Sequence, residues 1–281
     1  MAHPITLEHF SQKKKAHEPI TVVTAYDFPF ARIFDEAGAD IILVGDSLAN
    51  VVLGLESTKE IGIAEMVHHA KAVGRAVKRA FVVGDMPYSS YQVAGADTVG
   101  DAKQLIAAGC DAVKVEWFSG CLEVVAQLRG AGISVMGHIG LTPQTVDELG
   151  GYKVQGKTAE AAQRLYEEAL ALELAGCFSM VLECVPDRVA ALISRKLNAF
   201  TIGIGAGPDC DGQVLVLHDM LGLSSGKTAK FVKQFSQVGQ EVEKGVRAYL
   251  AQVSSRQYPS QEQVYHIDDR ELQTFVNRVE S

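Results

Sequence analysis

The sequence predicts a closed (β/α)8 TIM barrel, and three observations support this prediction. Eight short apolar runs rich in β-branched residues recur along the chain, most of them followed by a polar turn and an amphipathic stretch. Near-continuous apolarity within the runs is typical of strands buried on both faces, as in a parallel sheet. Eight such units in about 200 residues favour a closed barrel over an open doubly wound sheet, which usually has fewer strands and a dinucleotide fingerprint.

The expected strands follow one another without a low-complexity linker. In chain order they span residues 21–27, 40–46, 80–86, 112–117, 134–140, 178–184, 199–205 and 213–219. Helical patterns lie between them, such as residues 63–77, 101–109 and 160–176, and several end in glycine, as helix C-termini often do.

Extra helices are expected at both ends of the barrel. One precedes the first strand at residues 7–17, and its lysines at 13–15 are expected to form a solvated face. A long helix at 230–253 and a short one at 268–278 follow the last strand. We expect these extras to serve assembly.

The domain organisation follows from length and from the absence of an internal linker. A chain of 281 residues is compatible with one α/β barrel domain. We therefore expect a single domain over residues 1–281, with a barrel core at about 20–255 and a C-terminal helical tail at about 256–281.

Composition limits the classes of function. Hydrophobic residues make up 47% and charged residues 21%, which is ordinary globular usage and gives no support to a disordered or coiled-coil chain. Lysine and arginine number 26 against 34 aspartate and glutamate residues, and this net charge of −8 argues against a nucleic-acid or anionic-membrane surface. Small-molecule partners are therefore expected.

The cysteines and the N-terminus indicate a cytoplasmic location. The five cysteines are an odd, scattered set without a CxxC pair, which disfavours a disulfide framework and a cysteine-based zinc site. They are Cys110, Cys121, Cys177, Cys184 and Cys210. The N-terminus lacks the apolar region of a signal peptide, and no apolar stretch approaches the length of about 18 residues that a membrane span needs.

Polar side chains gather at the C-terminal ends of five consecutive expected strands, where barrel enzymes place their active sites. They are Asp46 with Ser47, Asp85, Lys114 with Glu116, His138 and Glu183. Lys114 and Glu116 are two residues apart and point to the same face of their strand, the barrel interior, while Val113 and Val115 point toward the helices.

Four carboxylates at one barrel mouth repel one another. At a separation of about 5 Å and an effective dielectric constant of about 20, each pair costs roughly 3 kcal/mol, and a single lysine does not compensate for this. Either some carboxyl groups are protonated or a divalent cation lies among them. Oxygen ligands from Asp46 and Asp85, with Glu116 direct or through water, suit Mg²⁺. If His138 were a ligand, the site would be more typical of zinc.

Each residue also has a structural interpretation. A single strand-end carboxylate is more often an N-cap or a solvated turn residue, and Ser47 could cap a helix or contact a ligand. His138 could be a core histidine or a catalytic one. Five such strand ends in succession favour a functional site, because buried unpaired charge is costly.

Seven segments together resemble the ketopantoate hydroxymethyltransferase family. They are VTAYD, VGDSLANVVLG, GDMPY, VKVE, MGHIGLTPQ, LECVP and GIGAGPDCDGQVLVLHDMLG, in order between about residues 21 and 223. The resemblance implies a (β/α)8 barrel, bound Mg²⁺ and a homodecamer. It also implies hydroxymethyl transfer from the co-substrate 5,10-methylenetetrahydrofolate to 3-methyl-2-oxobutanoate, giving 2-dehydropantoate for pantothenate and coenzyme A biosynthesis.

The resemblance also implies a role for each site residue. Asp46 and Asp85 would be metal ligands that also bind the substrate, Ser47 and Lys114 would contact the substrate, and Glu183 would be the catalytic base. Glu116, as a further metal ligand, and His138, as a substrate contact, fall in the same shell.

Physical chemistry agrees with this assignment. A 2-oxo acid can chelate Mg²⁺, and the cation then stabilises the enolate that forms when Glu183 removes the C3 proton. Lys114 would anchor the substrate carboxylate. Two alternatives remain: an aldolase that forms a Schiff base at Lys114, which the neighbouring Glu116 disfavours because it raises the lysine pKa, and a non-catalytic barrel that only binds a cation.

Overall fold

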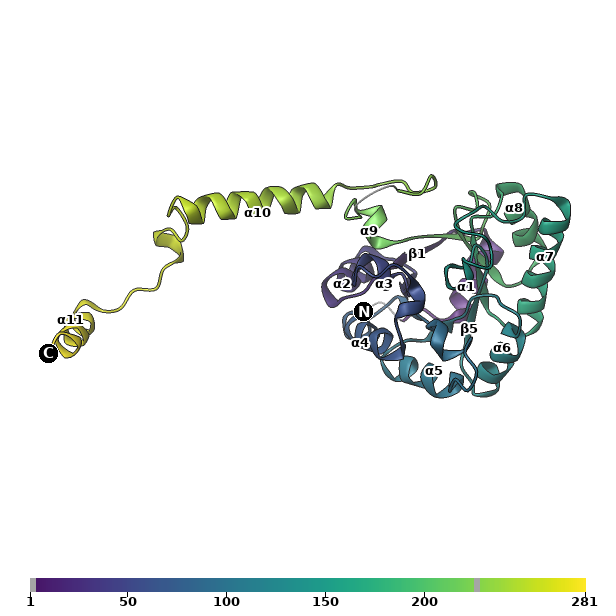
Figure 1. The fold of residues 1–281 in the computed structure, drawn as a ribbon, viewed down its shortest axis with the longest axis horizontal. Coiled ribbons are helices and arrows are strands. Elements are labelled where there is room, and N and C mark those ends of the chain that lie inside the picture. Colours follow the sequence, from purple (N-terminus) through teal and green to yellow (C-terminus); the bar gives the residue numbers. More distant parts are fainter. Residues whose placement is uncertain (1–3, 225–227) are drawn as a thin grey trace.

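The computed structural model describes residues 4–224 and 228–281, and its core is a closed barrel of eight parallel strands in sequence order (Figure 1). The strands are β1 Ile20–Thr24, β2 Ile41–Val44, β3 Phe81–Asp85, β4 Ala112–Lys114, β5 Val135–Gly140, β6 Ser179–Glu183, β7 Phe200–Ile204 and β8 Gly212–Leu215. β1 pairs with β8 in parallel and thereby closes the barrel, with Val22 opposite Val214. This confirms the predicted fold class.

Helices surround the strands and alternate with them from β1 to β7, as predicted (Figure 1). The alternation fails between β7 and β8, because residues 205–211 form turns and no helix. The helices are α1 Leu7–Ala16, α2 Phe28–Ala37, α3 Leu48–Val51, α4 Ile63–Ala76, α5 Thr98–Ala107, α6 Cys121–Gly130, α7 Ala159–Leu174, α8 Asp187–Lys196, α9 Leu217–Met220, α10 Val238–Ser254 and α11 Asp269–Val279. Short 3₁₀ turns lie at η1 Thr58–Glu60, η2 Tyr88–Ser90, η3 Pro143–Thr145 and η4 Gln261–Gln263. Gly109 and Gly176, which follow α5 and α7, have φ angles of 109° and 97°, the left-handed conformation that favours glycine after a helix.

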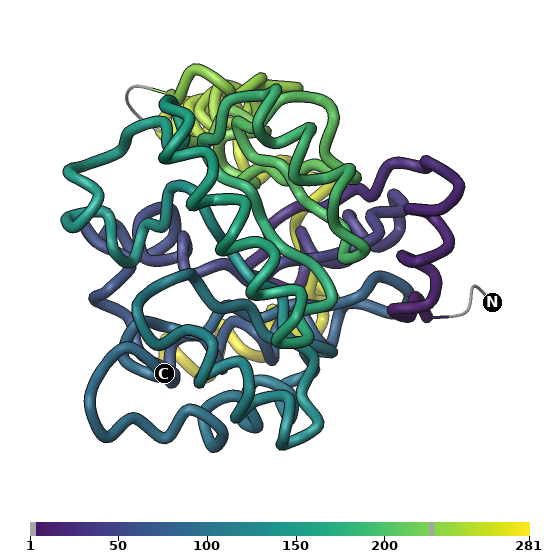
Figure 2. The backbone as a smooth tube through the Cα atoms, turned by 90° about the vertical axis from the view of Figure 1, so that its right-hand side faces the viewer, coloured from purple at the N-terminus to yellow at the C-terminus, as the bar shows by residue number. Residues whose placement is uncertain are grey.

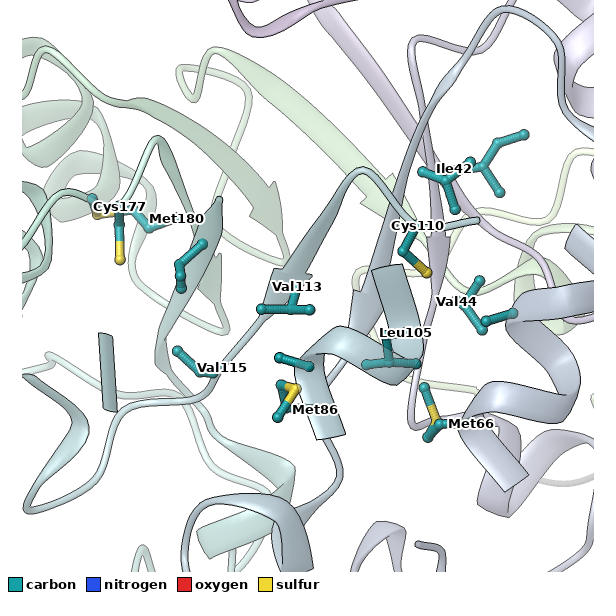
Figure 3. Close-up of a cluster of buried hydrophobic side chains, with 14 of the residues drawn as sticks. Ile42, Val44, Met66, Met86, Leu105, Cys110, Val113, Val115, Cys177 and Met180 are labelled. Carbon is teal, nitrogen blue, oxygen red and sulfur yellow. The ribbon is translucent and has the colours of Figure 1, made fainter. Parts of the chain in front are cut away.

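Two hydrophobic clusters stabilise the barrel. The larger one lies between strands and helices and includes Val113 and Val115, together with Met86 and Leu105 (Figure 3). The smaller one fills the barrel interior and includes Ala112, the residue before Val113. Because side chains alternate along a strand, Lys114 follows Ala112 to the inner face, as predicted.

Helix α1 covers the end of the barrel opposite the predicted site. Phe10 is fully buried against Phe81 and Phe200, with ring centroids 5.6 and 5.2 Å apart. Lys13 Nζ lies 2.7 Å from Asp40 Oδ2, and Lys14 Nζ lies 2.7 Å from Asp211 Oδ2. The prediction of a solvated face is therefore wrong for these two lysines, because both pair with carboxylates at the base of the barrel.

The C-terminal helices α10 and α11 extend away from the barrel (Figure 1), and in the rotated view they lie behind it (Figure 2). Neither helix buries a residue. The last barrel strand ends at Leu215, so the expected extent of the barrel core to about residue 255 stays a prediction. No helix among the described residues is long and apolar enough to span a membrane.

Candidate active site

One cavity at the C-terminal ends of the strands contains every residue that the sequence predicted for the site. It has a volume of about 720 Å³. Its lining includes Asp46, Ser47, Asp85, Lys114, Glu116, His138 and Glu183. They come from five neighbouring strands of one barrel, because each lies at or within two residues of the end of a strand from β2 to β6 except Ser47, which follows Asp46 after β2. The predicted convergence is therefore observed, and the roles of these residues are addressed below as proposals.

The buried ion pair between Lys114 and Asp85 lies at the centre of the site. β3 and β4 pair with Asp85 opposite Lys114, and this register places Lys114 Nζ 2.7 Å from Asp85 Oδ1. Asp85 Oδ2 accepts a hydrogen bond from the backbone N–H of Asp46 at 3.0 Å. Both oxygens of Asp85 therefore have partners, and the backbone of Asp46 is held beside them.

The neighbouring carboxylates stabilise the protonated form of Lys114. Burial alone lowers the pKa of a lysine, but Asp85, Asp46 and Glu116 raise the pKa of Lys114 by more, so that it lies above its ordinary value. Lys114 is thus held as an ammonium ion, which is the opposite of what a Schiff-base nucleophile needs.

Asp46 has a raised pKa because it is buried close to other carboxylates. Burial, and then the charges of Asp85 and Glu116, raise the pKa of Asp46 to about 8. Its Oδ2 accepts a hydrogen bond from Gln144 Nε2 at 2.9 Å, and no other hydrogen bond from the described residues reaches its carboxylate. A carboxylate in this position is stabilised by a further positive charge.

The donor set at this position fits a hard divalent cation. Asp46 and Asp85 are adjacent, buried and offer only oxygen atoms, the ligands that Mg²⁺ prefers. Within the described ranges, no group of three or more His, Cys, Asp or Glu side chains converges in an arrangement that could hold a metal ion. The fit therefore rests on the two aspartates, and water or substrate oxygens would complete the coordination.

His138 bridges the two glutamates of the site. Its Nδ1 lies 3.3 Å from Glu116 Oε1, and its Nε2 lies 3.3 Å from Glu183 Oε2. Although burial lowers the pKa of a histidine, these carboxylates raise the pKa of His138 to about 9. The pKa of Glu116 is lowered despite its burial, because of His138 and Lys114. His138 is thus a second cation in the site.

The sequence reasoning missed three buried residues that form hydrogen bonds with residues of the site. Gln144, in η3, and Tyr91, after η2, are buried and bound to the acidic residues, yet neither lies in a strand or a periodic pattern. Tyr26 lies 2.8 Å from Ser47 through their hydroxyl oxygens. Ser47 precedes α3 but its side chain makes no capping hydrogen bond, which favours ligand contact over helix capping. Only the position of Tyr26 just after β1 could have drawn attention to it.

Fold and site together define a closed barrel with a cavity of charged side chains at the C-terminal ends of its strands, the place where barrel enzymes have their active sites. A family model described as ketopantoate hydroxymethyltransferase matches residues 4–261. The chain belongs to this family, which makes it a hydroxymethyltransferase-type transferase.

Similar curated proteins agree over nearly the whole chain. One from Acetivibrio thermocellus, named 3-methyl-2-oxobutanoate hydroxymethyltransferase, is 48% identical over 96% of this chain and 95% of its own length. Proteins of the same name from Koribacter versatilis and Heliobacterium modesticaldum are 46% and 48% identical, covering 99% and 96% of this chain and 94% and 98% of their own lengths.

Solved structures share the fold at low identity. A phosphonopyruvate hydrolase in complex with oxalate and Mg²⁺ aligns with a TM-score of 0.59 at 11% identity, over 98% of this chain and 97% of that chain. A 2,3-dimethylmalate lyase, described as a member of the PEP mutase/isocitrate lyase superfamily, aligns with a TM-score of 0.57 at 13% identity, over 92% and 91%. These similarities confirm the barrel architecture.

Proposed function

We propose that the protein transfers a hydroxymethyl group from 5,10-methylenetetrahydrofolate to 3-methyl-2-oxobutanoate. The product would be 2-dehydropantoate, for pantothenate and coenzyme A biosynthesis, with water supplying the hydroxyl oxygen. The family and the names of the relatives support this reaction. The observation that carries the proposal is that one cavity combines two buried aspartates, a buried lysine and a carboxylate base.

The aspartates are the proposed Mg²⁺ site. Asp46 and Asp85 would hold the ion, with Glu116 contributing directly or through water. When bound, Mg²⁺ would supply Lewis-acid stabilisation of the negative charge that develops on the keto oxygen of the substrate. The raised pKa of Asp46 supports this site, because a cation there would relieve the repulsion from Asp85 and Glu116.

Lys114 and Ser47 are the proposed substrate anchors. The ammonium group of Lys114 is fixed by Asp85 at 2.7 Å, and an ordered point charge of this kind binds a carboxylate. The Ser47 hydroxyl, held by Tyr26, offers a further hydrogen bond at the cavity wall. Together they would orient the oxo acid with its C3 hydrogen toward Glu183.

Glu183 is the proposed base. It lies at the end of β6, it lines the cavity, and its side chain retains 16% exposure, in contrast to the nearly buried Asp46 and Asp85. His138 Nε2 lies 3.3 Å from one Glu183 oxygen, and the other oxygen is the proposed acceptor of the C3 proton. Water would break both C–N bonds of the methylene group and release the one-carbon unit from tetrahydrofolate at the oxidation level of formaldehyde. The carbanion at C3 would then attack this carbon, and its oxygen would take up a proton to become the new hydroxyl group. His138 is thereby proposed to act on the base in addition to its expected contact with the substrate.

An assay with both substrates tests the proposal. The purified protein should form 2-dehydropantoate, detected by mass spectrometry, only when 5,10-methylenetetrahydrofolate and Mg²⁺ are present. Borohydride added with the oxo acid should give no adduct at Lys114, since the lysine is held protonated. Product formation after exhaustive chelation would contradict the metal assignment, and a trapped adduct would favour the Schiff-base alternative.

We also propose a homo-oligomer in the cytoplasm. The C-terminal helix α10 exposes an apolar row, and each of these side chains is at least 44% accessible in the single chain. They are Val242, Val246, Tyr249, Leu250 and Val253. An exposed apolar row of this kind is typical of a protein–protein interface, and a homodecamer, which the family resemblance implies, would supply the partner. The five cysteines are free thiols, which suits a reducing compartment.

A further inference from the structure

Gln144 forms several hydrogen bonds with and around the acidic residues of the site. It lies in η3, just after β5, and is 1% exposed. Its Nε2 donates to Asp46 Oδ2 at 2.9 Å and to the carbonyl oxygen of Met86 at 3.0 Å. Its Oε1 accepts from the hydroxyl of Tyr91 and from Gln92 Nε2 at 2.9 Å. All four hydrogen-bonding positions of the amide are therefore used.

The neighbours also fix which way the amide points. The hydroxyl of Tyr91 accepts the backbone N–H of Glu116 at 3.0 Å, so its own proton is directed to Gln144 Oε1. The amide nitrogen consequently faces Asp46, where an ionised carboxylate can only accept. If the amide were flipped, its oxygen would face Asp46 Oδ2 and the carbonyl oxygen of Met86, and the hydrogen bond from Tyr91 would be lost.

Gln144 reaches the second glutamate as well. Its backbone N–H donates to Glu116 Oε2 at 2.9 Å, while Glu116 Oε1 faces His138. One residue therefore holds one carboxylate oxygen of Asp46 and one of Glu116. Asp46 and Glu116 line the cavity, whereas Gln144 is not among its lining residues, so both contacts are made outside the cavity lining.

We propose that Gln144 is a positioning residue of the metal site, an inference that rests on the proposed function. By holding Oδ2 of Asp46, it leaves the other carboxylate oxygen without a hydrogen bond from the described residues and available to Mg²⁺. By holding Glu116, it keeps the third acidic group at a fixed place beside the first two. Groups that orient metal ligands typically change metal affinity or activity about 10- to 100-fold when they are replaced.

The test is a calorimetric titration of Mg²⁺ into the protein without either substrate. Gln144→Met keeps the length of the side chain and removes its donor and acceptor. We expect this variant to bind Mg²⁺ about 10- to 100-fold more weakly than the wild type. Its kcat should recover largely at saturating Mg²⁺, because the direct ligands and Glu183 are intact.

Gln155→Met is the matched control. Gln155 lies in the same β5–α7 loop, and its Nε2 donates only to the carbonyl oxygen of Lys153. Its replacement should leave Mg²⁺ affinity at the wild-type value. Thermal unfolding of all variants reports whether a change in affinity accompanies a general loss of structure.

Three outcomes would overturn the inference. Wild-type Mg²⁺ affinity in Gln144→Met, with or without a lower melting temperature, would show a merely structural role. If Gln144→Met did not fold, Tyr91→Phe would replace it, since it removes one of the two donors to Gln144 Oε1 and the acceptor of the Glu116 N–H. Unchanged Mg²⁺ affinity there would also contradict positioning. A wild-type protein that binds no Mg²⁺ would instead contradict the metal site of the proposed function, and this inference with it.

Discussion

The seven site residues from the ends of β2 to β6 line the cavity, and among them Lys114 and His138 are the positive groups beside four carboxylates. Lys114 pairs with Asp85, and His138 lies between Glu116 and Glu183. Asp46 is the carboxylate without a cationic partner of its own among the described residues, and its pKa is raised to about 8. A cation added to the site is therefore expected to stabilise it most when it binds at Asp46.

Replacing Glu183 separates catalysis from metal binding. Glu183→Gln keeps the shape of the side chain but removes the proposed base, so kcat should fall by about 10²- to 10⁴-fold. Mg²⁺ affinity and melting temperature should stay near the wild-type values, because Glu183 is partly exposed and lies at the far side of His138 from Glu116. Steady-state kinetics with calorimetry measures both. An unchanged kcat would support a barrel that only binds a cation.

Glu168 lies on α7, outside the proposed site, and its raised pKa leads us to expect that the free energy of unfolding depends on pH. Burial raises the pKa of Glu168 to about 7, and Arg164 offsets this only in part. Between about pH 4.5 and pH 7 the folded state holds a proton that the unfolded state has released, so Glu168 makes stability decrease as pH rises through this window. After solvent screening of this partly exposed group, we expect a loss of about 1 kcal/mol.

Glu168→Gln tests this dependence. The variant should be more stable than the wild type at pH 8 and about equally stable at pH 5, in urea denaturation curves at both values. Glu167→Gln, one residue earlier and exposed, should show no such difference. Equal stabilisation of Glu168→Gln at both pH values would contradict the titration.

At the scale of elements, the sequence predicted the number and the order of the strands correctly, but it did not predict the residues at which the strands end. The expected strand at 112–117 is observed over Ala112–Lys114. Beyond it, the N–H groups of Val115 and Trp117 still donate to β5, whereas that of Glu116 donates to the Tyr91 hydroxyl. The expected strand at 213–219 ends at Leu215, and α9 begins at Leu217. A short buried helix and a buried strand have the same apolar pattern, so periodicity alone could not separate them.

The candidate site shows the same division. Its seven expected residues could be found because each follows an apolar run that ends at the barrel mouth. Tyr91 and Gln144 could not, since they lie in loops and reach the site only after β3, β4 and β5 have been brought together. Loop residues that act through long-range contacts carry no periodic signal.

Helix α1 is expected to stabilise the barrel rather than to cover it passively. Phe10→Ala removes a ring packed on Phe81 and Phe200 in the barrel base and should cost about 3–5 kcal/mol of stability. Urea denaturation should show a lower midpoint, with the Mg²⁺ affinity of the folded protein unchanged. Phe28→Ala, at a side chain that is 44% exposed, is the control. A loss below 1 kcal/mol in Phe10→Ala would mean that α1 contributes little to the closed barrel.

At the scale of the whole molecule, α10 and α11 extend away from the barrel and bury no residue within the described part of the chain (Figure 1). Val246 and Leu250 lie one turn apart on α10 and are 51% and 55% exposed. Their joint replacement, Val246→Lys with Leu250→Lys, should shift the protein to smaller species in light scattering after size exclusion. Gln240→Lys with Lys244→Gln, on the same helix, should not. An unchanged mass of the double lysine variant would contradict an interface through this row.

Exchange of the C3 hydrogen of 3-methyl-2-oxobutanoate for deuterium, followed by proton NMR without any folate, tests most directly whether the acidic rim activates the oxo acid. We expect exchange with the wild-type protein and Mg²⁺, its loss after chelation, and its loss in Glu183→Gln. No exchange by the wild type at saturating Mg²⁺, or exchange that persists in Glu183→Gln, would contradict enolisation by this site.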